Sequence, residues 1–251
     1  MNKHEAVEEY FSLVVREGLF SKRVKYYMNN LFQELSFDGK RVLDIGGGTG
    51  LYSFYAASMG AKKVICLEPE AEGSTNGVRQ RFKEIKSALR VSTPVEQYAT
   101  TIQCFNDSDE KFDIILSHNS INHLDEEACV NLMSDPQAKK TYCKIFKKLG
   151  SLAENGAKLI VADSSRHNFW DLCHLKNRFV PSIEWEKHAH PKEWARLLAD
   201  AGFCNPQIRW LSFNRLGHPG QLVLGNSVAS YFLDSSFCLT MDKMDVMNVP
   251  Q

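Results

Sequence analysis

A short run of glycines flanked by acidic residues is the clearest chemical feature of this sequence. Asp44 is followed by Gly46, Gly48 and Gly50, and Glu68 ends the next apolar run, 24 positions after Asp44. Glycines lack a Cβ, so the backbone can turn sharply and a ligand can lie against it near a helix N-terminus. A carboxylate at the end of the following strand suits the ribose hydroxyls of a nucleoside. The pattern therefore predicts a nucleoside site, because a turn without a ligand would not explain glycines where helix propensity is needed.

The spacing of the glycines separates two kinds of nucleoside site. The dinucleotide fingerprint requires a third glycine where this chain has Leu51. An acidic residue followed by xGxGxG resembles instead the motif of class I S-adenosylmethionine-dependent methyltransferases, and Asp44 with its three alternate glycines matches every defined position. The resemblance covers about residues 40–241. It implies an α/β, Rossmann-like doubly wound sheet of seven strands, mostly parallel with an antiparallel last strand, and an N-terminal helical cap.

The resemblance also implies roles for individual positions. Gly46 and Gly48 would lie against the methionine part of S-adenosylmethionine, and Asp44 would hold the loop or the amino group. Glu68 would accept hydrogen bonds from both ribose hydroxyls. The adenine contact would follow the third strand, where Glu96 and its two neighbours, Val95 and Gln97, are the candidates. The predicted cofactor-binding residues are Asp44, Gly46, Gly47, Gly48, Gly50, Glu68, Pro69, Glu96, Ser117 and His118.

The segment after the fourth predicted strand carries the candidate catalytic groups. The strand at 112–117 leads into a stretch with His118 and His123, where the resemblance places the cofactor sulfur and the acceptor. Methyl transfer from a sulfonium is an in-line displacement, and a base must remove the acceptor's proton if it has one. Histidine titrates near neutral pH and suits this role. We predict His123 and then His118 as the base, with Asn119 and Asn122 as substrate contacts; either histidine would otherwise only cap a helix or bind a loop carbonyl.

Residues 164–190 are the second candidate region for the acceptor. They follow the fifth predicted strand at Asp163 and hold charges, histidines and aromatics without a clean period. Long irregular connections in compact domains are commonly lids or binding loops, and these side chains suit a polar or anionic acceptor. The alternative is a solvated excursion whose tryptophans pack on the core. We predict no metal site, because His188 and His190 lack a third spaced ligand. The predicted substrate contacts of this segment are Arg166, Trp170, Trp185 and His188.

Charge and composition restrict the partners. The 251 residues carry 30 Lys+Arg and 30 Asp+Glu, whereas proteins that bind nucleic acid need surplus positive charge. The Asn-Pro-Pro-Tyr-type motif of family members that methylate DNA bases or glutamine is absent at 117–120. We therefore expect a small-molecule methyl acceptor and no nucleic acid. Scattered cysteines, no signal peptide and no long apolar run predict a cytoplasmic protein without a membrane partner.

Strand and helix patterns alternate as in a parallel sheet covered on both faces. Residues 5–35 are expected to be helical with a break at Gly18, 155–156 to turn, and 215–230 to connect two strands. Strands are expected at 41–45, 63–68, within 90–105, and at 112–117, 158–163, 207–213 and 236–241. Helices are expected at 51–59, 73–88, 137–153 and 191–201. The predicted single domain, 1–251, comprises a cap at 1–36, a cofactor-binding core at 37–163, a lid insertion at 164–190, a helix and strands at 191–241, and a tail at 242–251.

These features together predict an enzyme that moves a methyl group from S-adenosylmethionine to an oxygen or nitrogen of a small metabolite. Two histidines after the fourth strand slightly favour oxygen, since a hydroxyl needs a base. One alternative is a protein that binds S-adenosylmethionine for other chemistry or for none. Another is an NAD(P)-dependent oxidoreductase, although the chain lacks both the third glycine and a Tyr-x-x-x-Lys pair.

Overall fold

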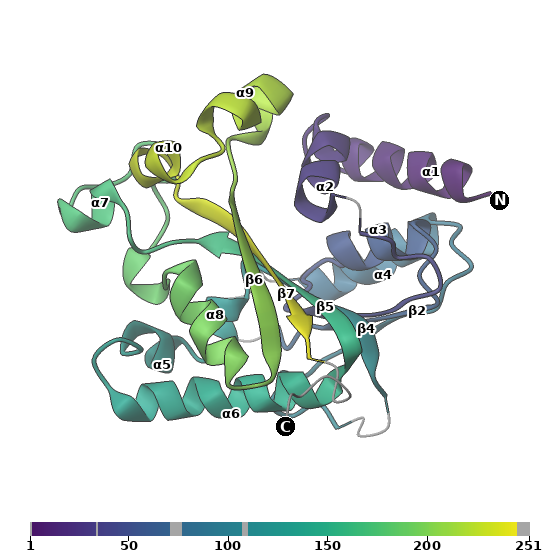
Figure 1. The fold of residues 1–251 in the computed structure, drawn as a ribbon. Helices are drawn as coiled ribbons and strands as arrows, with labels where there is room; N and C mark the ends of the chain where they lie inside the picture. Colours follow the sequence, from purple (N-terminus) through teal and green to yellow (C-terminus); the bar gives the residue numbers. More distant parts are fainter. Residues whose placement is uncertain (1, 34, 71–76, 107–109, 245–251) are drawn as a thin grey trace. The chain divides into compact units, whose positions relative to one another are not determined.

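The computed structural model describes a chain with two compact units (Figure 1). Unit 1 comprises residues 1–117 and 152–157, and unit 2 comprises residues 118–151 and 158–251. The strands form a seven-stranded sheet in the order β3-β2-β1-β4-β5-β7-β6, which confirms the predicted fold class. No described helix combines the length and the apolar character that crossing a membrane requires. The described residues are 2–33, 35–70, 77–106 and 110–244.

Unit 1 alternates strands and helices, and its sheet is parallel. β1 pairs with β2 and β4, and β2 pairs with β3. Val42, Leu43 and Ile45 of β1 are at most 2% exposed, so consecutive apolar residues reflect a strand covered on both faces. The elements are α1 (Lys3–Arg16), α2 (Val24–Phe32), β1 (Arg41–Ile45), α3 (Leu51–Ser58), β2 (Lys63–Leu67), α4 (Val78–Ala88), β3 (Val95–Tyr98) and β4 (Phe112–His118).

The register of these strands brings their carboxyl ends to one edge. Ile45 pairs with Leu67 of β2 and with Ser117 of β4. Cys66 of β2 pairs in turn with Gln97 of β3. The segments that follow the strands therefore start side by side, at the edge where open α/β sheets bind ligands.

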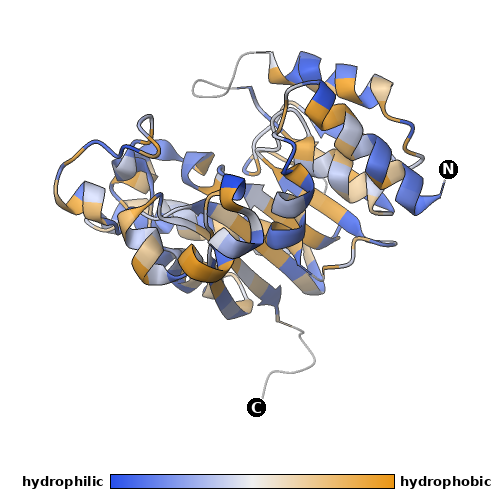
Figure 2. Ribbon diagram, turned by 90° about the horizontal axis from the view of Figure 1, so that it is seen from above, coloured by the Kyte–Doolittle hydropathy of each residue, from blue (hydrophilic) through white to orange (hydrophobic). Residues whose placement is uncertain are grey.

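The N-terminal helices pack on unit 1 through aromatic side chains. α1 begins with a capping box, in which the Asn2 side chain accepts from the Glu5 backbone N–H at 2.9 Å. Polar and apolar residues alternate around α1 next to the N-terminus in Figure 2. Tyr10 of its apolar face is fully buried, and its ring lies tilted against Tyr55 with centroids 5.7 Å apart. Its hydroxyl donates to the Leu51 carbonyl at 2.9 Å, where α3 begins. These contacts hold α1 against α3.

Unit 2 contains the antiparallel part of the sheet. β7 pairs antiparallel with both β5 and β6, which confirms the predicted orientation of the last strand. Tyr142 and Phe146 of α6 pack with Trp194 of α8, with ring centroids 5.0 Å and 6.0 Å from the indole. The elements are η1 (Ile121–Leu124), α5 (Glu126–Val130), α6 (Pro136–Leu152), β5 (Ala153–Ser164), α7 (Phe169–Leu172), η2 (Trp185–Lys187), α8 (Pro191–Ala199), β6 (Phe203–Trp210), η3 (Asn214–Leu216), α9 (Gly217–Leu224), α10 (Ser227–Phe232) and β7 (Ser236–Lys243).

Two strand boundaries correct the sequence-based expectation. β5 begins at Ala153, so residues 155–156 lie within a strand and the predicted turn is wrong. β6 covers Phe203–Trp210, earlier than the predicted 207–213. Its pairing with β7 passes an irregularity between Cys204 and Gln207 and continues to Phe203, which is buried. The buried Phe203 side chain therefore belongs to the strand, which begins before the predicted residue 207.

The connections of unit 2 also hold more helix than expected. Residues 215–230 include α9 and most of α10, and the Asn226 side chain caps α10 by accepting from the Ala229 N–H at 3.0 Å. β7 extends to Lys243, into the predicted tail. The first residues of the predicted helix 73–88 and the rest of the tail lie partly outside the described residues. Within 164–190 only α7 and η2 are helical.

Candidate active site

The loop between β1 and α3 is the part of unit 1 best shaped to hold a ligand. Gly46, Gly48 and Gly50 have φ of 64°, 56° and 81°, in the left-handed region that favours glycine. A Cβ on Gly47 would lie 2.6 Å from Asp44 Oδ2, so the inner side of the loop is closely packed. At Gly48, no heavy atom of the described residues lies within 4 Å of the Cβ position. The backbone at Gly48 is therefore open to close approach by a ligand.

Asp44 lies under this loop with one carboxylate oxygen unused. The residue is 1% exposed, and its Oδ2 accepts from Ser53 Oγ at 2.7 Å. Its Oδ1 is buried and has no partner among the described residues. Burial raises the pKa of Asp44 to about 6, while the hydrogen bonds from Ser53 act in the opposite direction. A buried acceptor without a donor is costly, so Oδ1 fits the amino group of a bound cofactor.

Glu68 connects the glycine loop to the end of β2. Its Oε2 accepts from the Gly48 N–H and its Oε1 from the Glu70 N–H, both at 2.9 Å. Gln97 of β3 donates from Nε2 to the Gly48 carbonyl, also at 2.9 Å. A carboxylate has about four acceptor positions, so Glu68 can accept ribose hydroxyls in addition. The conformation of the open loop thus depends on two side chains from neighbouring strands.

The residues predicted to contact adenine have different surroundings. Val95 is 1% exposed and belongs to the core, and Glu96 Oε2 accepts from the Tyr98 hydroxyl at 2.8 Å. Gln97, by contrast, reaches the glycine loop, because its side chain donates to the Gly48 carbonyl. Pro69, directly after Glu68, is half-buried. Gln97 is therefore the best-placed of the three candidates.

The end of β4 places its two predicted cofactor contacts in different settings. Ser117, the last residue of this part of unit 1, is 3% exposed. His118 belongs to unit 2, where burial lowers its pKa to about 4 against the opposing effect of Asp163. Asn119 is exposed with φ of 49°, and its N–H donates to the Ala162 carbonyl at 2.8 Å. His118 is therefore neutral at physiological pH.

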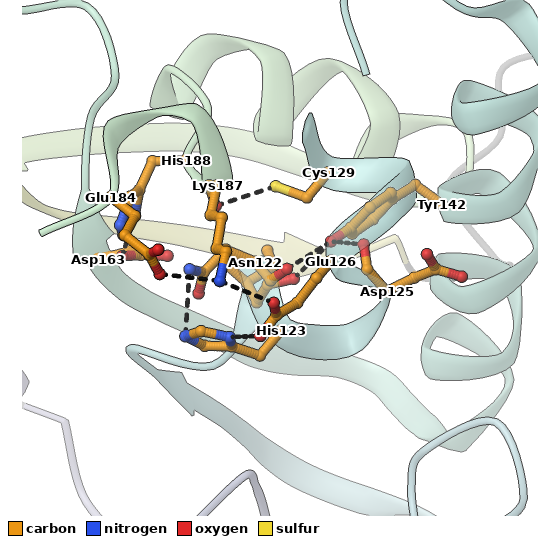
Figure 3. A network of polar contacts seen from close by, with 11 residues as sticks. Asn122, His123, Asp125, Glu126, Cys129, Tyr142, Asp163, Glu184, Lys187 and His188 are labelled. Atoms are coloured by element: carbon orange, nitrogen blue, oxygen red, sulfur yellow. Dashed lines mark hydrogen bonds and ion pairs between the residues drawn. The ribbon is translucent and has the colours of Figure 1, made fainter. Parts of the chain in front are cut away.

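His123 lies on η1 with both ring nitrogens in polar contacts (Figure 3). Nδ1 lies 2.6 Å from Glu126 Oε1, and Nε2 lies 3.3 Å from Asn122 Nδ2. A carboxylate accepts and an amide NH₂ donates, so these partners assign the neutral ring a proton on Nδ1 and a lone pair on Nε2. His123 is 46% exposed at its side chain, whereas Asn122 is 1% exposed. The Nε2 lone pair of His123 therefore faces the amide of the buried Asn122.

Lys187 of η2 joins this group to the 164–190 segment (Figure 3). Its Nζ lies 3.0 Å from Glu126 Oε2 and 2.8 Å from Glu184 Oε2. The hydrogen bonds to Glu184 and then to Glu126 raise the pKa of Lys187 well above its usual value. The Cys129 thiol of α5 donates to the Lys187 carbonyl at 3.1 Å. The backbone and the side chain of Lys187 are thus both attached to α5.

A second, buried pair lies where β5 ends. His188 Nδ1 is 3.1 Å from Asp163 Oδ1, with side chains 12% and 1% exposed. The Ser164 N–H also donates to Oδ1, at 2.7 Å. Asp163 Oδ2 is buried and has no partner among the described residues. This pair fixes His188 at the base of the 164–190 segment.

Arg166 and His188 line a cavity of about 500 Å³ in unit 2. Arg166 Nε lies 3.4 Å from Asp171 Oδ2 within the same wall. The two predicted tryptophans take part in packing: Trp170 donates from Nε1 to the Phe232 carbonyl at 2.9 Å, and Trp185 is 6% exposed. The full lining consists of Met133, Arg166, His167, Asn168, Asp171, Leu172, His188, Ala189, His190 and Glu193.

The pair His188 and His190 has other partners than a metal ion. His188 faces Asp163, and His190 Nδ1 accepts from the Lys192 N–H at 3.1 Å as the N-cap of α8. Across the described ranges, no three His, Cys, Asp or Glu side chains form a group that could hold a metal ion.

Three residues with clear site contacts escaped the sequence analysis: Ser53, Gln97 as a loop contact, and Glu126. Glu126 follows His123 by three positions, which puts both side chains on one face of a helical turn. The neighbouring acidic residues Asp125 and Glu127 offered the same charge, so spacing alone was a usable but weak signal. Ser53 and Gln97 had no distinguishing pattern, because their roles come from strand register and helix packing.

Comparisons with known proteins match much of this chain to methyltransferases. A family model described as a methyltransferase domain matches residues 42–136. The ubiquinone biosynthesis O-methyltransferase of Chelativorans sp. (strain BNC1) is 27% identical over 189 residues, which cover 72% of this chain and 65% of that protein. Protein arginine N-methyltransferase 6 of Danio rerio is 30% identical over 92 residues, 33% of this chain and 26% of that protein.

Solved structures share the fold at low sequence identity. The crystal structure of a putative S-adenosylmethionine dependent methyltransferase from Listeria monocytogenes has a TM-score of 0.57 at 15% identity, covering 88% of this chain and 100% of that one. The chain thus spans less than two thirds of these curated relatives, while it covers the full length of the Listeria monocytogenes structure.

Proposed function

We propose that this chain, which resembles the class I S-adenosylmethionine-dependent methyltransferases, transfers a methyl group from S-adenosylmethionine to an oxygen or nitrogen of a small-molecule metabolite. The observation that carries the proposal is the glycine loop, with Gly48 open and Asp44 Oδ1 buried without a partner among the described residues. These features suit a ligand with a positively charged amino group. S-adenosylmethionine is therefore the cofactor.

The residues of unit 1 would hold the cofactor by its polar ends. Asp44 would accept from the amino group, and Glu68 would accept from the ribose hydroxyls. Gly48 would let the backbone approach the methionine part, and Gln97 would keep that backbone in place. Bound S-adenosylmethionine supplies an electrophilic methyl group on a sulfonium. The task left to the protein is to orient the acceptor and to take its proton.

His123 is the proposed base. Its Nε2 carries the lone pair in the tautomer that Glu126 and Asn122 select. A proton from an acceptor hydroxyl or ammonium group would move to Nε2, and Glu126 would stabilise the imidazolium that forms. His118 is a poor base at neutral pH, because burial lowers its pKa to about 4. We assign His118 a neutral hydrogen-bonding role.

The cavity beside Arg166 and His188 is the proposed acceptor pocket, and the 164–190 segment its wall. Its lining mixes basic groups with Leu172, Met133 and Ala189, which suits a small molecule with a polar or anionic group on an apolar body. The O-methyltransferase among the relatives supports oxygen as the target atom. Asn119 and Asn122 remain proposed acceptor contacts.

Two measurements test the proposal. Calorimetry should show binding of S-adenosylhomocysteine and none of NADH; the reverse preference would sink the assignment. Incubation with methyl-labelled S-adenosylmethionine and a metabolite extract should yield a labelled small molecule that is heavier by one methylene. Cofactor binding without any labelled product would support a binding protein instead of a methyltransferase.

A further inference from the structure

We infer that Glu126 is a positioning residue for His123, and that Lys187 sets the negative charge that Glu126 presents to it. This inference rests on the proposed function, because it assigns Glu126 a role through the proposed base. It goes further in linking that base to the 164–190 segment, which carries Lys187. The 164–190 segment would then act electrostatically on His123, through Lys187 and Glu126.

The geometry supports a continuous chain of contacts. Glu126 uses different oxygens for its two partners: Oε1 lies 2.6 Å from His123 Nδ1, and Oε2 lies 3.0 Å from Lys187 Nζ. Both contacts therefore exist together. Lys187 continues to Glu184 at 2.8 Å, so the chain has alternating charges (Figure 3). Because Glu126 holds Nδ1, only Nε2 is left for an acceptor, whose proton would take the place of the 3.3 Å contact with Asn122 Nδ2.

The backbone that carries these side chains is held in place from two sides. The Asp125 side chain accepts from the Ala128 N–H at 2.9 Å and caps α5. The Tyr142 hydroxyl of α6 lies 3.1 Å from the carbonyl oxygens of Ile121 and Asn122, which anchors η1. The Cys129 contact with the Lys187 carbonyl anchors η2 to α5. These contacts hold the backbone of His123 and Glu126 in place, although the two side chains are partly exposed.

The charges around His123 act in opposite directions. The pKa of Glu126 is lowered first by the hydrogen bond to His123 and then by Lys187. Lys187 offsets part of the negative charge that Glu126 presents to His123. The other charged groups of this cluster are Asp125, beside η1, and Glu184, which borders η2. Loss of Glu126 should take from Nδ1 its acceptor, and loss of Lys187 should leave Glu126 in contact with His123.

The experiment determines the tautomer of the His123 ring by nitrogen NMR of the full chain, and in parallel measures kcat and KM. In the unchanged chain Nδ1 should carry the ring proton. Glu126→Gln should raise the fraction with the proton on Nε2, because an amide accepts more weakly than a carboxylate, whereas Lys187→Met should leave the proton on Nδ1. Glu126→Gln should also reduce kcat on the order of tenfold with little change in KM. Glu126→Asp should restore part of the kcat and of the original tautomer.

Glu127→Gln is the matched control, because Glu127 is the exposed next residue of α5 and carries the same charge. It should leave both readouts unchanged. An unchanged tautomer in Glu126→Gln, or an equal change in Glu127→Gln, would overturn the inference whatever the activity. A changed tautomer in Glu126→Gln accompanied by full turnover of His123→Ala would instead overturn the proposed base, and with it the catalytic role of Glu126, while methyl transfer itself would stand.

Discussion

The glycine loop of unit 1 and the His123 cluster of unit 2 (His123, Glu126, Lys187 and Glu184) are held together by different interactions. The loop is held by backbone groups and by two carboxylates, Asp44 and Glu68, that are at most 5% exposed. The cluster is held by side-chain ion pairs, and His123 and Glu126 are 46% and 36% exposed. The loop is therefore preformed and depends little on solvent, whereas the charges of the cluster are partly exposed to solvent and salt. Under the proposed function, we expect substitutions in the loop to change cofactor affinity and substitutions in the cluster to change rate.

The largest expected effect tests the rate side of this comparison. His123→Ala should reduce kcat by about 10²–10⁴-fold, because a general base contributes on that order, and should leave the affinity for S-adenosylhomocysteine unchanged. Steady-state kinetics and calorimetry measure the two quantities. His4→Ala, an exposed histidine of α1, is the control. A loss of affinity without a loss of kcat would reverse the division of roles.

The second prediction concerns a buried group of unit 2. His118 has a pKa of about 4 in the folded chain against about 6.5 in the unfolded one, so the unfolded chain binds the proton first as pH falls. The free energy of unfolding should therefore be fully maintained above pH 6.5 and lose about 3 kcal/mol by pH 4 through this group. His118→Gln should remove that loss.

Urea unfolding of both proteins at pH 7 and pH 4 measures this difference. Asp44 of unit 1, with its pKa raised to about 6, contributes a loss of stability as pH rises from about 4 to 6, so only the difference between variant and wild type isolates His118. Equal acid sensitivity of the two proteins would mean that His118 is solvated and available as a base.

The third prediction tests the affinity side. Glu68→Ala removes the acceptor for the ribose hydroxyls and for the Gly48 N–H, and should weaken S-adenosylhomocysteine binding by about 1.5–3 kcal/mol, or roughly 10- to 150-fold. Isothermal titration calorimetry gives the value. Glu84→Ala, an exposed carboxylate of α4 in the same unit, should bind normally. An unchanged affinity in Glu68→Ala would remove Glu68 from the cofactor site.

The smallest effect sharpens the description of the cluster. Glu184→Gln removes the outer partner of Lys187, whose contact with Glu126 remains. Because the Glu184 side chain is 60% exposed, solvent screens its charge, and kcat should change by less than about twofold. A decrease in kcat as large as that of Glu126→Gln would mean that Glu184 affects His123 as strongly as Glu126 does, despite its greater distance along the chain of contacts.

Much of the candidate site was predictable where local chain geometry determines it. Asp44 and the alternate glycines carry their own signal, because a turn between a strand and a helix needs left-handed φ at these positions. Glu68 followed from its position at the end of β2. The predictions for Glu96 and Gln97 were less specific, because only the register of β3 decides that Gln97 contacts Gly48 while Glu96 contacts Tyr98.

The sequence by itself determined the strand–loop–helix that carries Asp44 and Gly48, the parallel core and the likeness to a methyltransferase family, since each depends on neighbours in the chain. Only the tertiary structure decided how the surroundings of the two histidines differ. Burial lowers the pKa of His118, and Glu126 orients His123, whereas the sequence shows two similar histidines after one strand. It also brought Lys187 to Glu126 across 61 positions of the chain. Burial and long-range ion pairs depend on packing, which no local pattern records.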